Sequence, residues 1–229
     1  MKPHLTRPLQ WLAAAAVLAL AAAPALALEA FTATYRANAM GMQGEGQMTL
    51  TPQGGGKWKY ELSVRNQLVN LTQSTTFDEK DGAFRPLSSS DSSLVLIKRK
   101  SVQTHYDWSS KQATWSGDIK DHRKGPVPLQ PGDMDALLID LAIVRDVQAG
   151  KPLTYRMLEN GKASSTSYQA VGKETIEVAG KQLSATKVSR NDGKKQTIVW
   201  VVPDMPVPAR ILQRENGRDS YDLTLTSFQ

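Results

Sequence analysis

Strict alternation of apolar and polar residues is the feature that most constrains this chain. Trp58, Tyr60, Leu62 and Val64 alternate with lysine, glutamate and serine. Successive side chains of a β-strand point to opposite faces, so this spacing gives one apolar and one polar face. Similar runs recur along most of the chain. We therefore predict a mainly β protein of about ten or eleven short strands, mostly antiparallel because their connections are short.

One segment departs from this pattern and has helical spacing. Apolar residues recur at intervals of three and four between Met134 and Val147. Asp133 is expected to cap the start of this helix, and Gly150 follows its end. One helix is too narrow to cover the apolar face of so many strands. The predicted fold is a single curled antiparallel sheet, an open or incomplete barrel, with this helix across its concave face.

The stretch from Trp200 to Arg210 contains three prolines directly after an apolar run. Proline cannot donate a hydrogen bond to a sheet, so the strand at residues 197–202 should end there and a connection should lead to the next strand. That strand is apolar at successive positions, so we expect both of its faces to be covered. The pair Asn216–Gly217 predicts a tight hairpin near the C-terminus.

The first 27 residues have the composition of an export signal. Lys2 and Arg7 precede an Ala/Leu-rich stretch, and Ala25-Leu26-Ala27 forms a small-x-small cleavage site. We expect cleavage there, leaving residues 28–229 as one β-rich domain. The sequence contains no cysteine, so it offers neither disulfides nor an N-terminal cysteine for lipid attachment. The expected product is a soluble periplasmic protein without a lipid anchor.

A sheet of this size, curled around one helix, should leave an apolar cavity unless large side chains fill it. The inward-facing residues of the predicted strands and helix include aromatic, methionine and leucine side chains, which suit an adaptable pocket. The candidate cavity-lining residues are Tyr35, Met48, Tyr60, Tyr106, Trp108, Trp115, Met134, Leu138 and Leu141. A fully packed core is the alternative, because such residues on strands are often core residues.

Catalytic chemistry has little support in the sequence. There is no cysteine nucleophile and no Gly-x-Ser-x-Gly motif, and only His105 and His122 follow the predicted cleavage site. Ser184 and Lys187 have the spacing of a serine–lysine pair, but a strand places positions three apart on opposite faces. We predict that the protein is not an enzyme and needs no cofactor.

A metal site is also not expected. Asp118, Asp121 and His122 have suitable side chains, but Lys120, Arg123 and Lys124 surround them and oppose a cation. The segment is interpreted as a solvated loop.

A basic cluster, Lys98-Arg99-Lys100, lies in a chain with 28 Lys and Arg residues against 22 Asp and Glu. Export makes nucleic acid an unsuitable partner for this charge. An anionic membrane surface is the partner that the cluster would attract, with a merely solvated face as the alternative.

Several glycine, proline and acidic motifs, taken in their order, resemble the bacterial envelope family called domain of unknown function 3108 (DUF3108). They are Phe31-x-x-x-Tyr35, Gly41-x-x-Gly44-x-Gly46, the run from Phe77 to Pro86, Asp135-x-Leu137, Gly150 to Leu153, Gly172-x-Glu174 and Trp200-x-x-x-Asp204-x-x-x-Pro208-x-Arg210. The resemblance covers nearly all of residues 28–229 and brings no catalytic residues. More distantly, the predicted fold is similar to the LolA and LolB lipoprotein carriers, which implies binding of a lipid or acyl chain.

The sequence thus predicts a non-enzymatic periplasmic protein that binds or carries a lipid-like or other apolar ligand on the concave face of its sheet. The alternative is an envelope scaffold or interaction protein with a filled core and no small-molecule ligand.

Overall fold

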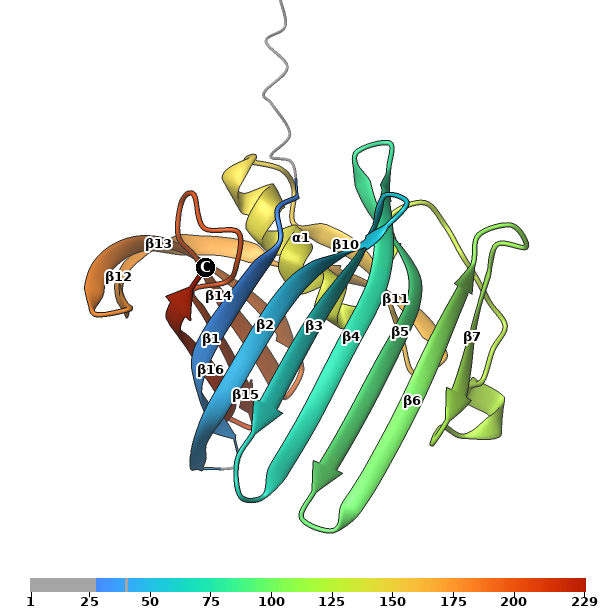
Figure 1. The fold of residues 1–229 in the computed structure, drawn as a ribbon, viewed down its shortest axis with the longest axis horizontal. Helices are drawn as coiled ribbons and strands as arrows, with labels where there is room; N and C mark the ends of the chain where they lie inside the picture. Colours follow the sequence, from blue (N-terminus) through green and yellow to red (C-terminus); the bar gives the residue numbers. More distant parts are fainter. Residues whose placement is uncertain (1–27, 40) are drawn as a thin grey trace, which may run out of the picture.

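The computed structural model describes residues 28–39 and 41–229. The predicted export signal, residues 1–27, lies outside them. One antiparallel sheet contains thirteen strands, in the order β12-β13-β14-β15-β16-β1-β2-β3-β4-β5-β6-β7-β8. Figure 1 shows the sheet curled around the helix α1, with β12 and β8 as its two unpaired edges. The prediction of a curled open sheet with one helix is confirmed.

The strands of this sheet are β1 (Phe31–Ala39), β2 (Met42–Gly54), β3 (Lys57–Arg65), β4 (Val69–Lys80), β5 (Ala83–Val95), β6 (Lys98–Asp107), β7 (Gln112–Gly117), β8 (Val127–Pro128), β12 (Gln169–Val178), β13 (Lys181–Asp192), β14 (Lys195–Val201), β15 (Arg210–Glu215) and β16 (Arg218–Phe228). A second, three-stranded sheet contains β9 (Asp133–Met134), β10 (Thr154–Glu159) and β11 (Lys162–Ser167). A 3₁₀ turn, η1, spans Asp121–Arg123.

The structure has more strands than the alternation predicted, and β4 and β5 are the longest of those that were missed. These two long strands form a hairpin in the middle of the sheet and carry serine, threonine and asparagine on both faces. Polar residues on both faces hide the period-two signal, so propensity alone did not reveal them. Backbone pairing with β3 and β6 holds them in the sheet.

The helix α1 spans Ala136–Gln148, within the predicted segment. Its N-cap is Asp135, whose Oδ1 accepts a hydrogen bond from the Leu138 amide at 2.8 Å. The expectation that Asp133 caps the helix was wrong. Asp133 lies in β9, paired with β10, and its carboxylate forms a buried ion pair with Arg156. The extended pairing of β9 delays the helix start by two residues.

The proline-rich stretch ends β14 and connects it to β15, as predicted, and the two strands pair antiparallel. Tyr35 holds this connection, because its hydroxyl donates a hydrogen bond to the Pro208 carbonyl at 2.8 Å. Residues 198–201 are all buried, so the expectation that this strand is covered on both faces is confirmed. The Trp200 ring is covered by Arg210, whose guanidinium carbon lies 4.9 Å from the ring centroid. The Asn216–Gly217 hairpin also forms, between β15 and β16.

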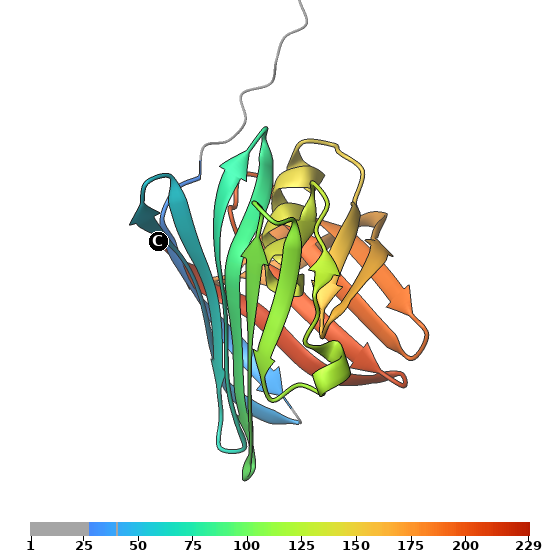
Figure 2. The ribbon, with the colours of Figure 1, turned by 90° about the vertical axis from the view of Figure 1, so that its right-hand side faces the viewer.

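The two ends of the curled sheet differ. In Figure 2, α1 lies between the two arms of the sheet, one running through β4 to β7 and the other through β12 to β15. At the closed end, where α1 finishes, the Phe77 and Phe84 rings pack edge to face with centroids 5.2 Å apart. The Arg145 guanidinium lies 4.1 Å from the Phe84 centroid. At the open end, β3 turns into β4 and β5 turns into β6. Within the described residues, no helix has the length and apolar content needed to cross a membrane.

Candidate functional site

A cavity of about 680 Å³ lies between the N-terminal half of α1 and the open end of the sheet. Apolar side chains from both arms of the sheet and from the helix form its walls. They include Leu62, Val69, Leu71, Val95, Leu137, Ile139, Met157 and Ile211. Several of these come from strands far apart in sequence, and the curl of the sheet brings them together.

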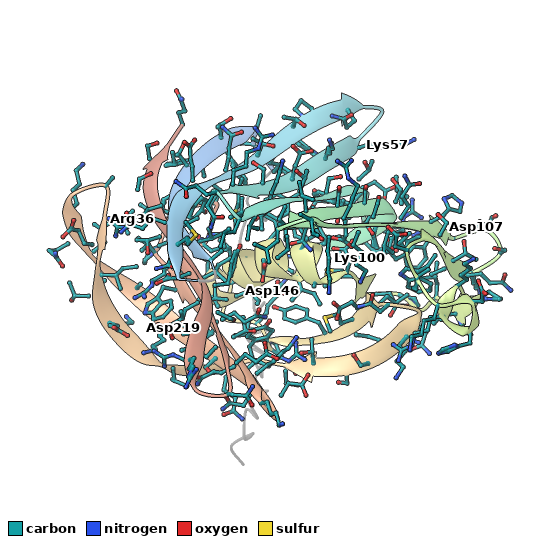
Figure 3. The ribbon with its side chains drawn as sticks, turned by 90° about the horizontal axis from the view of Figure 1, so that it is seen from below. Arg36, Lys57, Lys100, Asp107, Asp146 and Asp219 are labelled. Atoms are coloured by element: carbon teal, nitrogen blue, oxygen red, sulfur yellow. The ribbon has the colours of Figure 1, made fainter. Side chains whose placement is uncertain are left out.

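The mouth of this main cavity is polar. Its exposed lining residues are Glu159, Lys162, Ser164, Asp192 and Lys195, which lie in or next to the β10–β11 and β13–β14 turns. Seen from this end in Figure 3, strands surround α1 on both sides. The main cavity therefore combines aliphatic side chains with polar ones such as Gln73, Thr197 and Gln213 and has a charged rim, an arrangement that suits an amphiphilic molecule.

Asp140 is the one carboxylate that α1 contributes to the main cavity. Among the described residues, no group donates a hydrogen bond to it and no cation pairs with it. Burial, and then the negative charge of Asp135, raises the pKa of Asp140 to about 7. A carboxyl group without partners inside a protein favours its neutral form, so Asp140 changes charge near neutral pH.

Two tyrosines face the same space. Tyr168 and Tyr221 both line the main cavity, and the buried Tyr221 hydroxyl has no hydrogen-bond partner among the described residues. Burial and the nearby Asp140 carboxylate raise the pKa of Tyr168 to about 12 and that of Tyr221 further above its ordinary value. Both hydroxyls thus stay protonated and neutral. A buried polar group without a hydrogen-bond partner is costly, so the Tyr221 hydroxyl lowers stability at this position.

A smaller cavity of about 190 Å³ adjoins the main one, since both are lined by Leu71, Gln73, Ala136 and Leu137. Its polar lining includes residues from β4 and β5 and the N-cap of α1. There the Asp135 carboxylate accepts a hydrogen bond from Thr75 at 2.8 Å. Burial raises the pKa of Asp135 to about 6, against the opposing effect of its hydrogen bonds. This network ties the start of the helix to the two polar strands.

The residues considered for catalysis or metal binding lie apart from the main cavity. His105 and His122 are both exposed and do not line the main cavity. Ser184 is exposed on β13, whereas Lys187 on the same strand pairs with Glu174 at 2.9 Å. Within residues 28–39 and 41–229, no group of three or more histidine, aspartate or glutamate side chains is placed to hold a metal ion.

The nine side chains predicted to line a cavity lie mostly in the packed core. Tyr35, Met48, Tyr60, Tyr106, Met134, Leu138 and Leu141 are buried there. The Tyr60 hydroxyl contacts the Met48 sulfur at 3.2 Å, and the half-buried Trp108 donates to the Pro86 carbonyl at 2.6 Å. Trp115 lines the smaller cavity. Ligand contact by any of the nine stays a prediction.

Sequence reasoning missed the polar residues that line the main cavity. Asp140 had a visible signal, because it is the single charged residue in the apolar run from Ala136 to Val144. A charge in such a run is either partnered or placed for function. Tyr168, Arg190 and Tyr221 carry no comparable signal, since Arg190 and Tyr221 stand in ordinary strands and Tyr168 joins β11 to β12.

Residues 30–224 match the family described as "Protein of unknown function (DUF3108)", and the chain belongs to that family. The resemblance recognised from the motifs is thereby confirmed. A comparison with the curated proteins finds no match.

Among solved structures, a beta-barrel-like protein of DUF1849 from Brucella abortus aligns with a TM-score of 0.58 and 10% identity, over 88% of this chain and 98% of that one. This likeness shows a shared fold and nothing about function. Two others score lower. The MucA/MucB complex of Pseudomonas aeruginosa aligns with a TM-score of 0.36 and 13% identity, over 87% of this chain and 51% of that one. A putative outer membrane lipoprotein-sorting protein domain from Vibrio parahaemolyticus aligns with a TM-score of 0.24 and 11% identity, over 87% of this chain and 84% of that one. Scores this low support no conclusion about fold or function.

Proposed function

We propose that this DUF3108 protein is a soluble periplasmic binder or carrier of an apolar, lipid-like molecule, held in the main cavity between α1 and the sheet. The observation that carries the proposal is the cavity itself, about 680 Å³ in volume with apolar walls and a charged rim. Small-molecule sites typically measure about 300–1,000 Å³ and combine apolar walls with a few polar groups. A filled interior, as a pure scaffold would have, leaves no such space.

The aliphatic residues that line the main cavity favour a ligand with an alkyl chain at one end. Leu62, Leu71 and Ile211 approach from the two arms of the sheet, and Leu137 and Ile139 from the helix. Transfer of alkyl groups from water to such walls is favourable by about 0.8 kcal/mol per CH₂. The charged residues at the mouth then accommodate a polar head group without burying it.

Asp140 favours a ligand whose hydroxyl or amine reaches into the main cavity, since Arg190 of the same lining is already paired with Asp192 at 2.7 Å. An ionised Asp140 repels the carboxylate of a free fatty acid but accepts a hydrogen bond from a hydroxyl or ammonium group. The unpartnered Tyr221 hydroxyl offers a second contact. We therefore expect alkyl amines and alcohols to bind more tightly than alkyl carboxylates of equal length at pH 8.

Binding without catalysis fits the same residues. Among the residues that line the main cavity there is no histidine, and its other two carboxylates, Glu159 and Asp192, lie at the exposed mouth. The periplasm, where lipids travel between two membranes, is the compartment that the N-terminal composition favours.

The direct test is native mass spectrometry of the protein purified from the periplasm, followed by organic extraction of any bound lipid. A bound amphiphile supports the proposal. An empty protein that also fails to bind N-phenyl-1-naphthylamine, a neutral probe of apolar sites, overturns it and favours the scaffold.

A cavity-blocking variant sharpens that test. Ala136 is exposed at the start of α1 and lines both cavities, so Ala136→Trp places an indole in the shared space. We expect roughly a 10-fold loss of probe affinity. Ala170→Trp, at an exposed position on β12, is the matched control and should bind as the original protein does. Equal binding by both variants and the parent contradicts the location of the site.

A further inference from the structure

The turn between β5 and β6 exposes two large apolar side chains. Val95 pairs directly with Lys98, so Leu96 and Ile97 alone form the turn. Leu96 is 58% exposed and Ile97 is 93% exposed. Such exposure of two large aliphatic side chains contributes little to the core.

The backbone of this turn disfavours the residue it contains. Leu96 has a φ of +56°, in the left-handed region that glycine and asparagine adopt most easily. The β13–β14 turn has the same length and the same left-handed backbone at its first position, but there the residue is Gly193, with φ +58°. Two further turns of this length, Asp81–Gly82 and Asn216–Gly217, also follow the usual preference. The β5–β6 turn thus shares the left-handed backbone of these turns but places an aliphatic residue at the first position, where they place glycine, asparagine or aspartate.

Three cations follow the turn without anionic partners. Lys98, Arg99 and Lys100 are all exposed, and within the described part of the chain none of them forms an ion pair. Lys100 lines the smaller cavity and so lies on the concave face, where Figure 3 labels it. Arg99 is the intervening residue and points to the convex face. Positive charge therefore surrounds the apolar tip on both sides of the sheet.

The turn also projects from the open end of the sheet. In Figures 1 and 2 it is the lowest point of the molecule, beyond the neighbouring β3–β4 turn. Val95, directly before the turn, lines the main cavity. A surface that touches this tip therefore comes close to the mouth of that cavity.

We propose that the β5–β6 turn is a membrane-docking tip. Leu96 and Ile97 insert into the interface of an anionic lipid bilayer, and Lys98, Arg99 and Lys100 contact the phosphates of its head groups. Docking in this way turns the mouth of the main cavity toward the bilayer. The proposal goes beyond ligand binding and does not require it, since docking depends only on the exposed tip.

The chemistry of the tip selects a membrane over a protein partner. Two aliphatic side chains on a narrow projection offer much less contact than the roughly 800 Å² per partner that a stable protein interface needs. An apolar tip flanked by unpaired cations matches the two layers of an anionic membrane surface, apolar below and negatively charged above.

Vesicle co-sedimentation tests the proposal with the purified protein. We expect binding to vesicles of equal phosphatidylglycerol and phosphatidylcholine, and little binding to phosphatidylcholine alone. Ile97→Ser should weaken binding roughly 10-fold through the lost apolar contact. Replacing Lys98, Arg99 and Lys100 together by glutamine should weaken it roughly 100-fold. Val171→Ser, which removes another exposed aliphatic residue on β12, is the matched control and should leave binding unchanged.

A site-specific probe gives an independent measurement, because the sequence has no cysteine. A single environment-sensitive dye on Ile97→Cys should shift its emission to the blue when anionic vesicles are added, whereas the same dye on Val171→Cys should not. Absence of a shift at residue 97, an equal shift at both residues, or equal binding to neutral vesicles overturns the proposal. If the protein does not dock on anionic vesicles but still binds N-phenyl-1-naphthylamine, the docking proposal is wrong and the proposed ligand site is still supported. The two proposals can therefore fail separately.

Discussion

Two carboxylates on the same helix, Asp140 and Asp146, have opposite surroundings. Asp146 lies toward the closed end, where it accepts hydrogen bonds from Arg145 at 2.9 Å and from Tyr155 at 3.2 Å. Asp140 lies toward the open end and has no partner among the described residues, although it lines the main cavity. One carboxylate thus belongs to a satisfied network, and the other faces empty space.

The same contrast extends to the whole of each end. The closed end is filled by packed rings and by aliphatic side chains of the second half of α1, such as the fully buried Ile143. The open end has the cavity, the unpartnered Tyr221 hydroxyl and an exposed apolar turn. The closed end therefore contributes stability, while the open end retains features that lower stability and suit binding.

The largest expected effect is on packing at the closed end. Ile143→Ala leaves a cavity in a filled region, and we expect unfolding free energy to fall by about 3–4 kcal/mol. Leu71→Ala, in the half-buried wall of the main cavity, should cost about 1 kcal/mol, because part of its surroundings is already empty. Urea denaturation of both variants measures the difference. Equal losses contradict the division into a filled and an open end.

The two carboxylates should respond to substitution with opposite signs. Asp146→Asn removes the charge that Arg145 and Tyr155 contact, and we expect a loss of about 2 kcal/mol. Thermal and urea unfolding of this variant at pH 8 give the value. A stabilised Asp146→Asn protein shows that the network at the closed end does not hold the helix.

Asp140→Asn should instead stabilise the protein at pH 8. The pKa of Asp140 is raised to about 7, so the folded state binds its proton more tightly than the unfolded state does. The contribution of Asp140 to the free energy of unfolding is therefore present in full at low pH and is lost as the pH rises from about 4 to 7. The asparagine variant does not lose this stability, so we expect its free energy of unfolding at pH 8 to exceed that of the parent by about 1–2 kcal/mol. The gain is smaller than for a fully buried carboxylate because the cavity admits water.

The control for this prediction is the same comparison at pH 5, where Asp140 is mostly protonated in the folded state. There the two proteins should differ by much less. The variant should also lose the preference of the parent for dodecylamine over dodecanoate. A stability difference that does not change with pH contradicts an unpartnered Asp140.

The smallest expected effect is at the docking tip. Leu96→Gly relieves a left-handed leucine, and we expect a gain of about 0.5–1 kcal/mol, limited by the greater freedom of glycine in the unfolded chain. Differential scanning calorimetry detects the corresponding rise in Tm. Gly193→Leu in the β13–β14 turn is the reverse exchange and should lower Tm. A fall in Tm for Leu96→Gly means that the leucine contributes to folding rather than to membrane contact.

Alternation and helical spacing predicted most of the architecture. Runs such as Trp58 to Val64 have one apolar face, and burying it requires the sheet to curl over the helix. The missed strands, β4 and β5, have serine and threonine on both faces and gain their order from pairing with β3 and β6. The N-cap was misplaced for a related reason, since the pairing of β9 with β10 depends on residues distant in sequence.

The cavity residues were harder to predict than the fold. The sequence indicates which side chains face inward, but several inward positions, such as Tyr60 and Leu138, meet each other and pack. Whether an inward side chain meets a neighbour or empty space depends on how the two arms of the sheet and the helix are spaced. Asp140 and Tyr221 reach the same space from elements that are distant in the chain.

The sequence by itself determined the strands with one apolar face, the single helix, the proline connection and the membership of a family. These follow from local periodicity and turn chemistry, which act within a few residues. The tertiary structure decided that one end is filled while the other keeps a cavity beside an exposed apolar turn. That outcome depends on distances between elements far apart in the chain, which periodicity does not specify.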